Sequence, residues 1–87
     1  MNRLSIEERL VAFLHSVTGQ DALHAETDLL QAGVTDSLTM MDLLVFIETD
    51  FQLRLAFSDL NPDVFRTPRT IAELIASRLE RPQPQAA

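Results

Sequence analysis

The sequence predicts an all-α fold, a small antiparallel bundle of three to four helices, and three observations indicate it. Apolar residues recur at intervals of three and four in three separate stretches, which is the period of an amphipathic helix. Each stretch opens with a serine or a threonine, the residues that favour a helix start. The one run that alternates like a strand, residues 51–55, has no second strand with which to pair.

The first helix is expected to begin at Ser5 and to end before Gly19. Ser5 and Glu8 have the spacing of a capping box, in which each side chain satisfies a backbone N–H at the helix start. The core face should consist of the apolar residues that follow at helical spacing: Ile6, Leu10, Phe13, Leu14 and Val17. Residues 20–35 form a long connection without a period, which we expect three leucines to anchor in the core: Leu23, Leu29 and Leu30.

The second helix should run from about Ser37 to Asp50, and it carries two apolar lines. One is expected to face the core: Met40, Leu44, Ile47 and Phe51, widened by Leu43 and Phe46. The other lies on a different side of the helix and comprises Leu38, Met41 and Val45. A methionine at helical spacing is more often buried in the core than exposed. A helix in a bundle this small cannot bury both lines, however, so we interpret the second line as exposed to partners.

One short turn and one helix are predicted in the remaining chain. Residues 51–55 should be an extended connector whose apolar side chains pack inward. Asn61 precedes a proline and an acid, which predicts a single helical turn. Thr70 and Glu73 form another capping box, and the last helix should follow with three apolar residues on one face: Leu74, Ile75 and Leu79.

Size, composition and charge limit the possible functions. The 87 residues suffice for one small domain, placed at 1–80, and the proline-containing segment 81–87 is expected to be a disordered tail. The absence of cysteine excludes disulfides and thiolate metal sites. A formal net charge of −6 disfavours nucleic-acid binding and favours partners with basic patches. Neither a membrane-spanning stretch nor a signal peptide is evident, so a cytoplasmic monomer without membrane insertion is expected.

Asp36-Ser37-Leu38, at the start of the second helix, is the feature most informative about function. It follows Gly33-Val34-Thr35, a flexible approach to the helix. A helix start has unpaired N–H groups and the positive end of the helix dipole, so it would stabilise a phosphodiester attached to Ser37. N-capping is the ordinary role of a serine at this place, and Asp36 could also be the cap.

In this setting the triplet resembles the modification site of the acyl and peptidyl carrier proteins, and the resemblance extends from about Ile6 to Leu79. The predicted order of helices and loops agrees with that family, and so do three further segments: Thr27-Asp28-Leu29-Leu30, Phe51, and Asp59 to Phe65. The resemblance implies that Ser37 is esterified by 4′-phosphopantetheine, whose thiol holds a cargo as a thioester. Asp36 and Leu38 would complete the motif, Asp36 as an acidic contact for the phosphopantetheinyl transferase.

The resemblance further implies a free-standing acyl or aminoacyl carrier that is not an enzyme. Its partners would be the transferase, a ligase or transferase that loads the cargo, and downstream biosynthetic enzymes. The contacts for these partners are expected on the second helix: Met41, Asp42, Val45 and Glu48. Gly33 lies three residues before Asp36, and Thr39 takes the place of an acid after the triplet. The glycine spacing resembles the discrete carriers for D-alanine, other amino acids or unusual extender units, and the missing acid departs from the usual fatty-acid carriers.

These features predict a small cargo, in specialised metabolism, and the bulky core predicts little space for a long acyl chain. Two alternatives remain open at this point. An unmodified helical adaptor would bind partners through the line of Leu38, Met41 and Val45. A small hydrolase would use Ser37 with a histidine and an aspartate, but no nucleophile elbow or oxyanion loop is recognisable. His15 and His24 lack the neighbours of a metal site, so no metal is expected.

Overall fold

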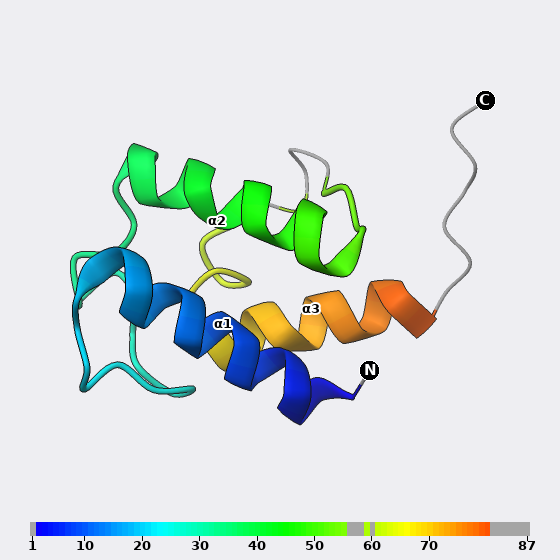
Figure 1. The fold of residues 1–87 in the computed structure, drawn as a ribbon, viewed down its shortest axis with the longest axis horizontal. Coiled ribbons are helices and arrows are strands. Elements are labelled where there is room, and N and C mark those ends of the chain that lie inside the picture. Colours follow the sequence, from blue (N-terminus) through cyan, green and yellow to red (C-terminus); the bar gives the residue numbers. More distant parts are fainter. Residues whose placement is uncertain (1, 56–58, 60, 81–87) are drawn as a thin grey trace.

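Residues 2–55, 59 and 61–80 are described by the computed structural model of the chain, and in these residues it is all-α. Helix α1 spans Arg3–Thr18, α2 spans Ser37–Phe51 and α3 spans Pro68–Glu80, with no strand in the described part. Figure 1 shows α1 running in one direction and α2 and α3 running in the opposite direction. The predicted small antiparallel bundle is therefore confirmed. The expected tail, 81–87, lies outside the described residues.

Helices α1 and α3 each begin earlier than predicted. The Asn2 side chain accepts a hydrogen bond from the Ser5 backbone N–H at 2.8 Å, so Asn2 is the cap and Ser5 lies inside the first turn. The Thr67 hydroxyl likewise accepts from the Thr70 N–H at 3.1 Å. Pro68 is then the first residue of α3, where its missing N–H costs nothing. Both predicted capping boxes are wrong, because an earlier polar side chain satisfies the N–H groups at each helix start.

One buried cluster joins all three helices and their connections. Its members are Ile6, Leu10, Leu14, Leu23, Leu29, Val34, Leu43, Ile47, Phe51, Leu53, Phe65, Ile71, Ala72 and Ile75. On α2 the centre of the core face is Leu43, while Met40 and Leu44 are only half-buried at its margin. The predicted core face of α2 is thus confirmed, but its buried residues are Leu43, Ile47 and Phe51, and Met40 and Leu44 lie at the edge of that face.

Three residues predicted to face the core are exposed: Val17 (40%), Leu30 (72%) and Leu79 (39%). Val17 lies in the last turn of α1, directly before the chain turns away at Gly19. Leu79 lies in the last turn of α3. Leu30 is adjacent to the buried Leu29, and the turn that orients Leu29 inward directs Leu30 outward. The prediction that Leu30 anchors the first connection is therefore wrong.

The first connection is held against the start of α3 by two backbone hydrogen bonds. The Leu29 N–H donates to the Arg66 carbonyl at 2.8 Å, and the Arg69 N–H donates to the Ala25 carbonyl at 2.9 Å. Residues far apart in the sequence thereby become neighbours on one side of the molecule. This contact fixes the segment that leads into α2.

Charged side chains reinforce the same junction. Glu7 of α1 is buried, and its carboxylate lies 2.7 Å from the Arg3 guanidinium and 3.6 Å from that of Arg69. Arg69 also contacts Glu26 of the first connection at 3.1 Å. Removing one partner of a buried ion pair leaves a charge without compensation. The network therefore holds α1, the first connection and α3 in one arrangement.

The second connection has the two features predicted for it. The chain leaves α2 at Gln52 in a left-handed conformation with φ of 52° and then buries Leu53, as expected of an inward-packed connector. The Asn61 side chain accepts a hydrogen bond from the Val64 N–H at 2.9 Å and so caps a single turn at 62–65. None of the described helices is long and apolar enough to cross a membrane.

Candidate functional site

Ser37 is the first residue of α2, and its side chain is exposed. Asp36 precedes it in an extended conformation, and its carboxylate accepts a hydrogen bond from the Thr39 N–H at 3.1 Å. Of the two residues that the sequence left open as the cap, Asp36 therefore has this role. Within the described residues the Ser37 hydroxyl makes no hydrogen bond. Ser37 thus presents a hydroxyl that the helix does not use.

The capping hydrogen bonds also keep Asp36 ionised. Hydrogen bonds from Thr39, from its side chain first and its backbone N–H second, hold the pKa of the Asp36 carboxyl below its ordinary value. A negative charge at this position also interacts favourably with the positive end of the α2 dipole. The folded state therefore favours the ionised form of Asp36.

We expect Asp36→Ala to lower the melting temperature at neutral pH, because the Thr39 N–H loses its acceptor. Since the pKa is lower in the folded state, the stabilisation is present above the unfolded pKa of about 3.9 and is lost as the pH falls through the folded pKa. The difference between wild type and variant should then shrink in strong acid. Circular dichroism melts at neutral and acidic pH measure it. Ser37→Ala is the control, and an Asp36→Ala melt identical to wild type at neutral pH would contradict the capping role.

The apolar line on α2 lies at the surface. Leu38 is 73% exposed, and Met41 and Val45 are each 60% exposed. The prediction that these residues are excluded from the core is confirmed, whereas their contact with partners stays a prediction. Asp42 and Glu48 are also exposed on this helix, and Glu48 lies 3.5 Å from the Arg54 guanidinium. An ion pair this exposed contributes little to stability, which leaves Glu48 available for contacts.

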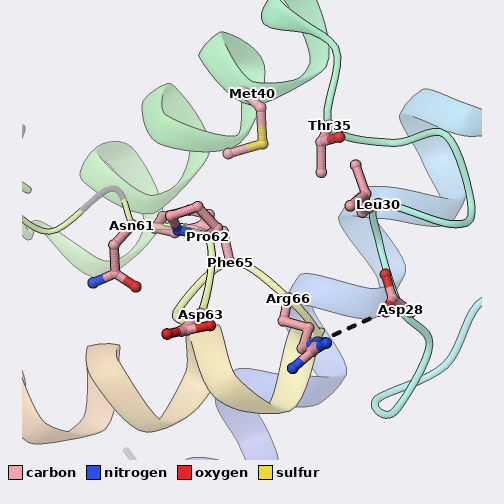
Figure 2. Close-up of a pocket in the computed structure, with 9 residues that line it drawn as sticks. All are labelled: Asp28, Leu30, Thr35, Met40, Asn61, Pro62, Asp63, Phe65 and Arg66. Atoms are coloured by element: carbon pink, nitrogen blue, oxygen red, sulfur yellow. Dashed lines mark ion pairs between the residues drawn. The ribbon is translucent and has the colours of Figure 1, made fainter.

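A pocket of about 400 Å³ lies beside the N-terminal end of α2. Figure 2 shows that Met40 and Thr35 approach it from the α2 side, with Leu30 next to them and the turn that precedes α3 opposite. The lining residues are Asp28, Leu30, Thr35, Met40, Asn61, Pro62, Asp63, Phe65 and Arg66. Ligand pockets in proteins range from about 300 to 1,000 Å³, so this one suits a small ligand.

Sequence reasoning missed this pocket. It lies between segments that only the fold brings together: the first connection, α2 and the turn before α3. Asp28 lies in a segment that the family resemblance singled out, yet nothing in the sequence pairs it with Arg66. In the structure the Arg66 Nε lies 3.7 Å from the Asp28 Oδ2. This pair forms part of the pocket wall (Figure 2).

The two histidines bond to backbone groups elsewhere. The His15 Nε2 lies 2.6 Å from the Leu23 carbonyl oxygen, and the His24 Nδ1 accepts from the Glu26 N–H at 3.1 Å. Both line a hollow along α1 rather than the pocket beside α2. The described residues therefore do not assemble the serine, histidine and aspartate of a hydrolase at Ser37. They also contain no group of three or more side chains positioned to hold a metal ion.

Comparison with known proteins identifies a matching family model and several proteins of similar sequence. The family model described as "Phosphopantetheine attachment site" matches residues 8–76. The D-alanyl carrier protein of Enterococcus faecalis is 30% identical over 74 residues, which cover 83% of this chain and 95% of that protein. The D-alanyl carrier protein of Leuconostoc citreum is 25% identical, with 85% and 96% covered. Aminoacyl carrier protein 2 of Bradyrhizobium diazoefficiens is 26% identical, with 87% and 89% covered.

Proposed function

This chain belongs to the phosphopantetheine attachment site family, and from that premise we propose that it carries a small aminoacyl or acyl unit on an arm esterified to Ser37. The observation that supports this assignment most directly is the Ser37 hydroxyl, which is exposed at the first residue of α2 and has no hydrogen bond in the described part of the chain. In carrier proteins the attached group is 4′-phosphopantetheine.

The residues around Ser37 fit a phosphodiester-linked arm. Because Asp36 caps α2, esterification of Ser37 would remove no hydrogen bond from the helix start. The first-turn N–H groups and the positive end of the α2 dipole favour the negative charge of a phosphodiester. When bound, the arm supplies a thiol that holds the cargo as a thioester. The protein's own contribution is to tether and orient that cargo, which raises its concentration near partner enzymes.

Two likenesses support a small cargo. The relatives reported above are named as D-alanyl and aminoacyl carriers, and the interval from Gly33 to Asp36 resembles the discrete carriers for such units. We propose a role in specialised metabolism, without catalysis by this chain. Its partners would be a phosphopantetheinyl transferase, a ligase or transferase that loads the cargo, and the enzymes that use it.

For these partners we propose a docking surface on α2, formed by Leu38, Met41 and Val45 with Asp42 and Glu48. The apolar residues provide area that the fold leaves exposed. The two acids would speed encounter with basic partner surfaces, since complementary charge acts mainly on association rates. An unmodified adaptor would use the same surface, so docking alone does not distinguish the two functions.

Met41→Glu should slow loading or transfer by a cognate enzyme while leaving the helical circular dichroism unchanged. The reason is that Met41 is 60% exposed, so the charge disturbs the docking surface and not the core. Thr49→Glu is a matched control, because it adds the same charge at another exposed position of α2. Equal rates for the two variants would contradict the proposed surface, and unfolding of Met41→Glu would place Met41 in the core.

The proposed function is tested by incubating the chain with coenzyme A and a transferase of broad specificity. We expect the intact mass to increase by one arm per chain. A folded chain that gains no mass while still binding its partners would contradict the carrier function and favour the adaptor.

A further inference from the structure

We infer, as an extension of the proposed function, that the pocket beside α2 recognises the ammonium group of an aminoacyl cargo, and that the Asp28 carboxylate binds it. Asp28 would then be a specificity-determining residue, and an uncharged acyl unit of the same size would be held less well. Four features of the pocket support this inference: its position, its walls, its charge and the geometry of the Asp28–Arg66 pair.

The pocket lies next to the proposed attachment point. Thr35 and Met40, which line it, are two residues before and three residues after Ser37. Residues three apart in a helix lie on the same side of it, so Ser37 and Met40 share the side of α2 that borders the pocket. A cargo tethered at Ser37 is therefore held near this pocket at high effective concentration.

The walls suit a short aliphatic group. Leu30, Met40, Pro62 and Phe65 supply apolar surface from three separate segments, and Figure 2 shows the Met40 side chain directed toward the turn that carries Pro62 and Phe65. Phe65 belongs to the buried core and closes the pocket on that side. The volume of about 400 Å³ is near the lower limit for ligand pockets.

The charges of the lining residues favour a cation. The lining includes the carboxylates of Asp28 and Asp63 and one guanidinium, that of Arg66, so negative groups outnumber positive ones. Asp63 forms no ion pair with any other described residue. An aminoacyl unit bound through its carbonyl keeps a free ammonium group, which would balance the excess negative charge. A cargo with a free carboxylate would instead be repelled by both aspartates.

Asp28 has the capacity to accept a further hydrogen bond. Its Oδ1 accepts from the Gln31 N–H at 3.1 Å, which holds the side chain in place. Its Oδ2 lies 3.7 Å from the Arg66 Nε, which is too long for a hydrogen bond. The Arg66 side chain is 66% exposed, against 31% for Asp28. Arg66 can therefore move into solvent when an ammonium group approaches the Oδ2.

Two variants that break the same ion pair distinguish recognition from a structural role. Asp28→Asn keeps an oxygen for the Gln31 N–H but removes the negative charge, so it should weaken binding of the ammonium. Arg66→Gln removes the competing cation and should strengthen it. If the Asp28–Arg66 pair only stabilised the fold, both variants would change the binding of the ammonium group in the same direction.

The experiment uses the full chain, loaded at Ser37 with an arm that carries an ¹⁵N-labelled alanyl group through an amide in place of the thioester. We expect NMR titration to show a higher pKa for the alanyl amino group than on the free arm, a smaller increase in Asp28→Asn and a larger one in Arg66→Gln. Asp21→Asn, an exposed acid outside both the pocket and the docking surface, should match wild type. The same arm carrying propionyl, which lacks the amino group, should shift the amide signals of Leu30, Met40 and Phe65 less.

An alanyl amino group that titrates as on the free arm, or variants that change its pKa in the same direction, would overturn the inference while leaving the carrier function intact. A chain that accepts no arm at all would overturn the proposed function, and this inference with it. The intact mass, recorded before the titration, separates these two results.

Discussion

Ser37→Ala is expected to accept no phosphopantetheine arm and to retain the fold of the wild type. The variant removes the only atom that the proposed attachment uses, the Ser37 hydroxyl oxygen. The same change should leave α2 intact, because Asp36 and not Ser37 accepts the hydrogen bond from the Thr39 N–H. Intact mass spectrometry after incubation with coenzyme A and a transferase measures the first effect, and a thermal melt measures the second.

Ser16→Ala is the matched control for the mass measurement. Ser16 is an exposed serine within α1, so its variant should gain the arm as wild type does. A mass increase in Ser37→Ala would show that the arm is attached elsewhere. Loss of folding in Ser37→Ala would instead show that the Ser37 hydroxyl has a structural role at the start of α2, contrary to the capping geometry.

Leu43→Ala is expected to lower the free energy of unfolding by about 2–5 kcal/mol, the range for a leucine truncated in a packed core. Leu43 is 1% exposed and is the centre of the α2 core face. Met41→Ala, two residues away on the same helix, should change it by no more than about 0.5 kcal/mol, because Met41 is 60% exposed. Urea unfolding followed by circular dichroism compares the two variants.

This pair of truncations tests the division of α2 into a buried side and an exposed side. Helix propensity differs little between leucine and methionine, so substitution by alanine changes the helix propensity by a similar amount in both variants. Equal destabilisation would mean that Met41 is packed in solution. A stable Leu43→Ala protein would mean that the core can collapse around the missing side chain.

The sequence was sufficient for features that depend on local periodicity and local chemistry. Apolar spacing located α1, α2 and α3, since a helix in a small domain must bury one side against its neighbours. The same spacing separated the buried Ile47 from the exposed Val45 on α2. The triplet at 36–38 fell at a helix start as predicted, and the family match at residues 8–76 agrees with the resemblance seen in the sequence.

Only the structure decided where α1 and α3 begin and how the connections are oriented. Several polar side chains near a helix start can accept hydrogen bonds from the same N–H groups. In the structure Asn2 and Thr67 accept them in place of the predicted caps, Ser5 and Thr70. Leu29 and Leu30 have identical side chains, and only the fold shows that Leu29, whose N–H donates to the Arg66 carbonyl, is the buried one.

The pocket beside α2 depended on the tertiary structure entirely. Its walls come from the first connection, α2 and the turn before α3, and the Asp28–Arg66 pair joins residues that lie far apart in the sequence. Periodicity reports which side of a helix is buried, but it carries no information about which loop lies beside which. The sequence alone thus determined the helices and the candidate serine, whereas long-range packing decided what surrounds that serine.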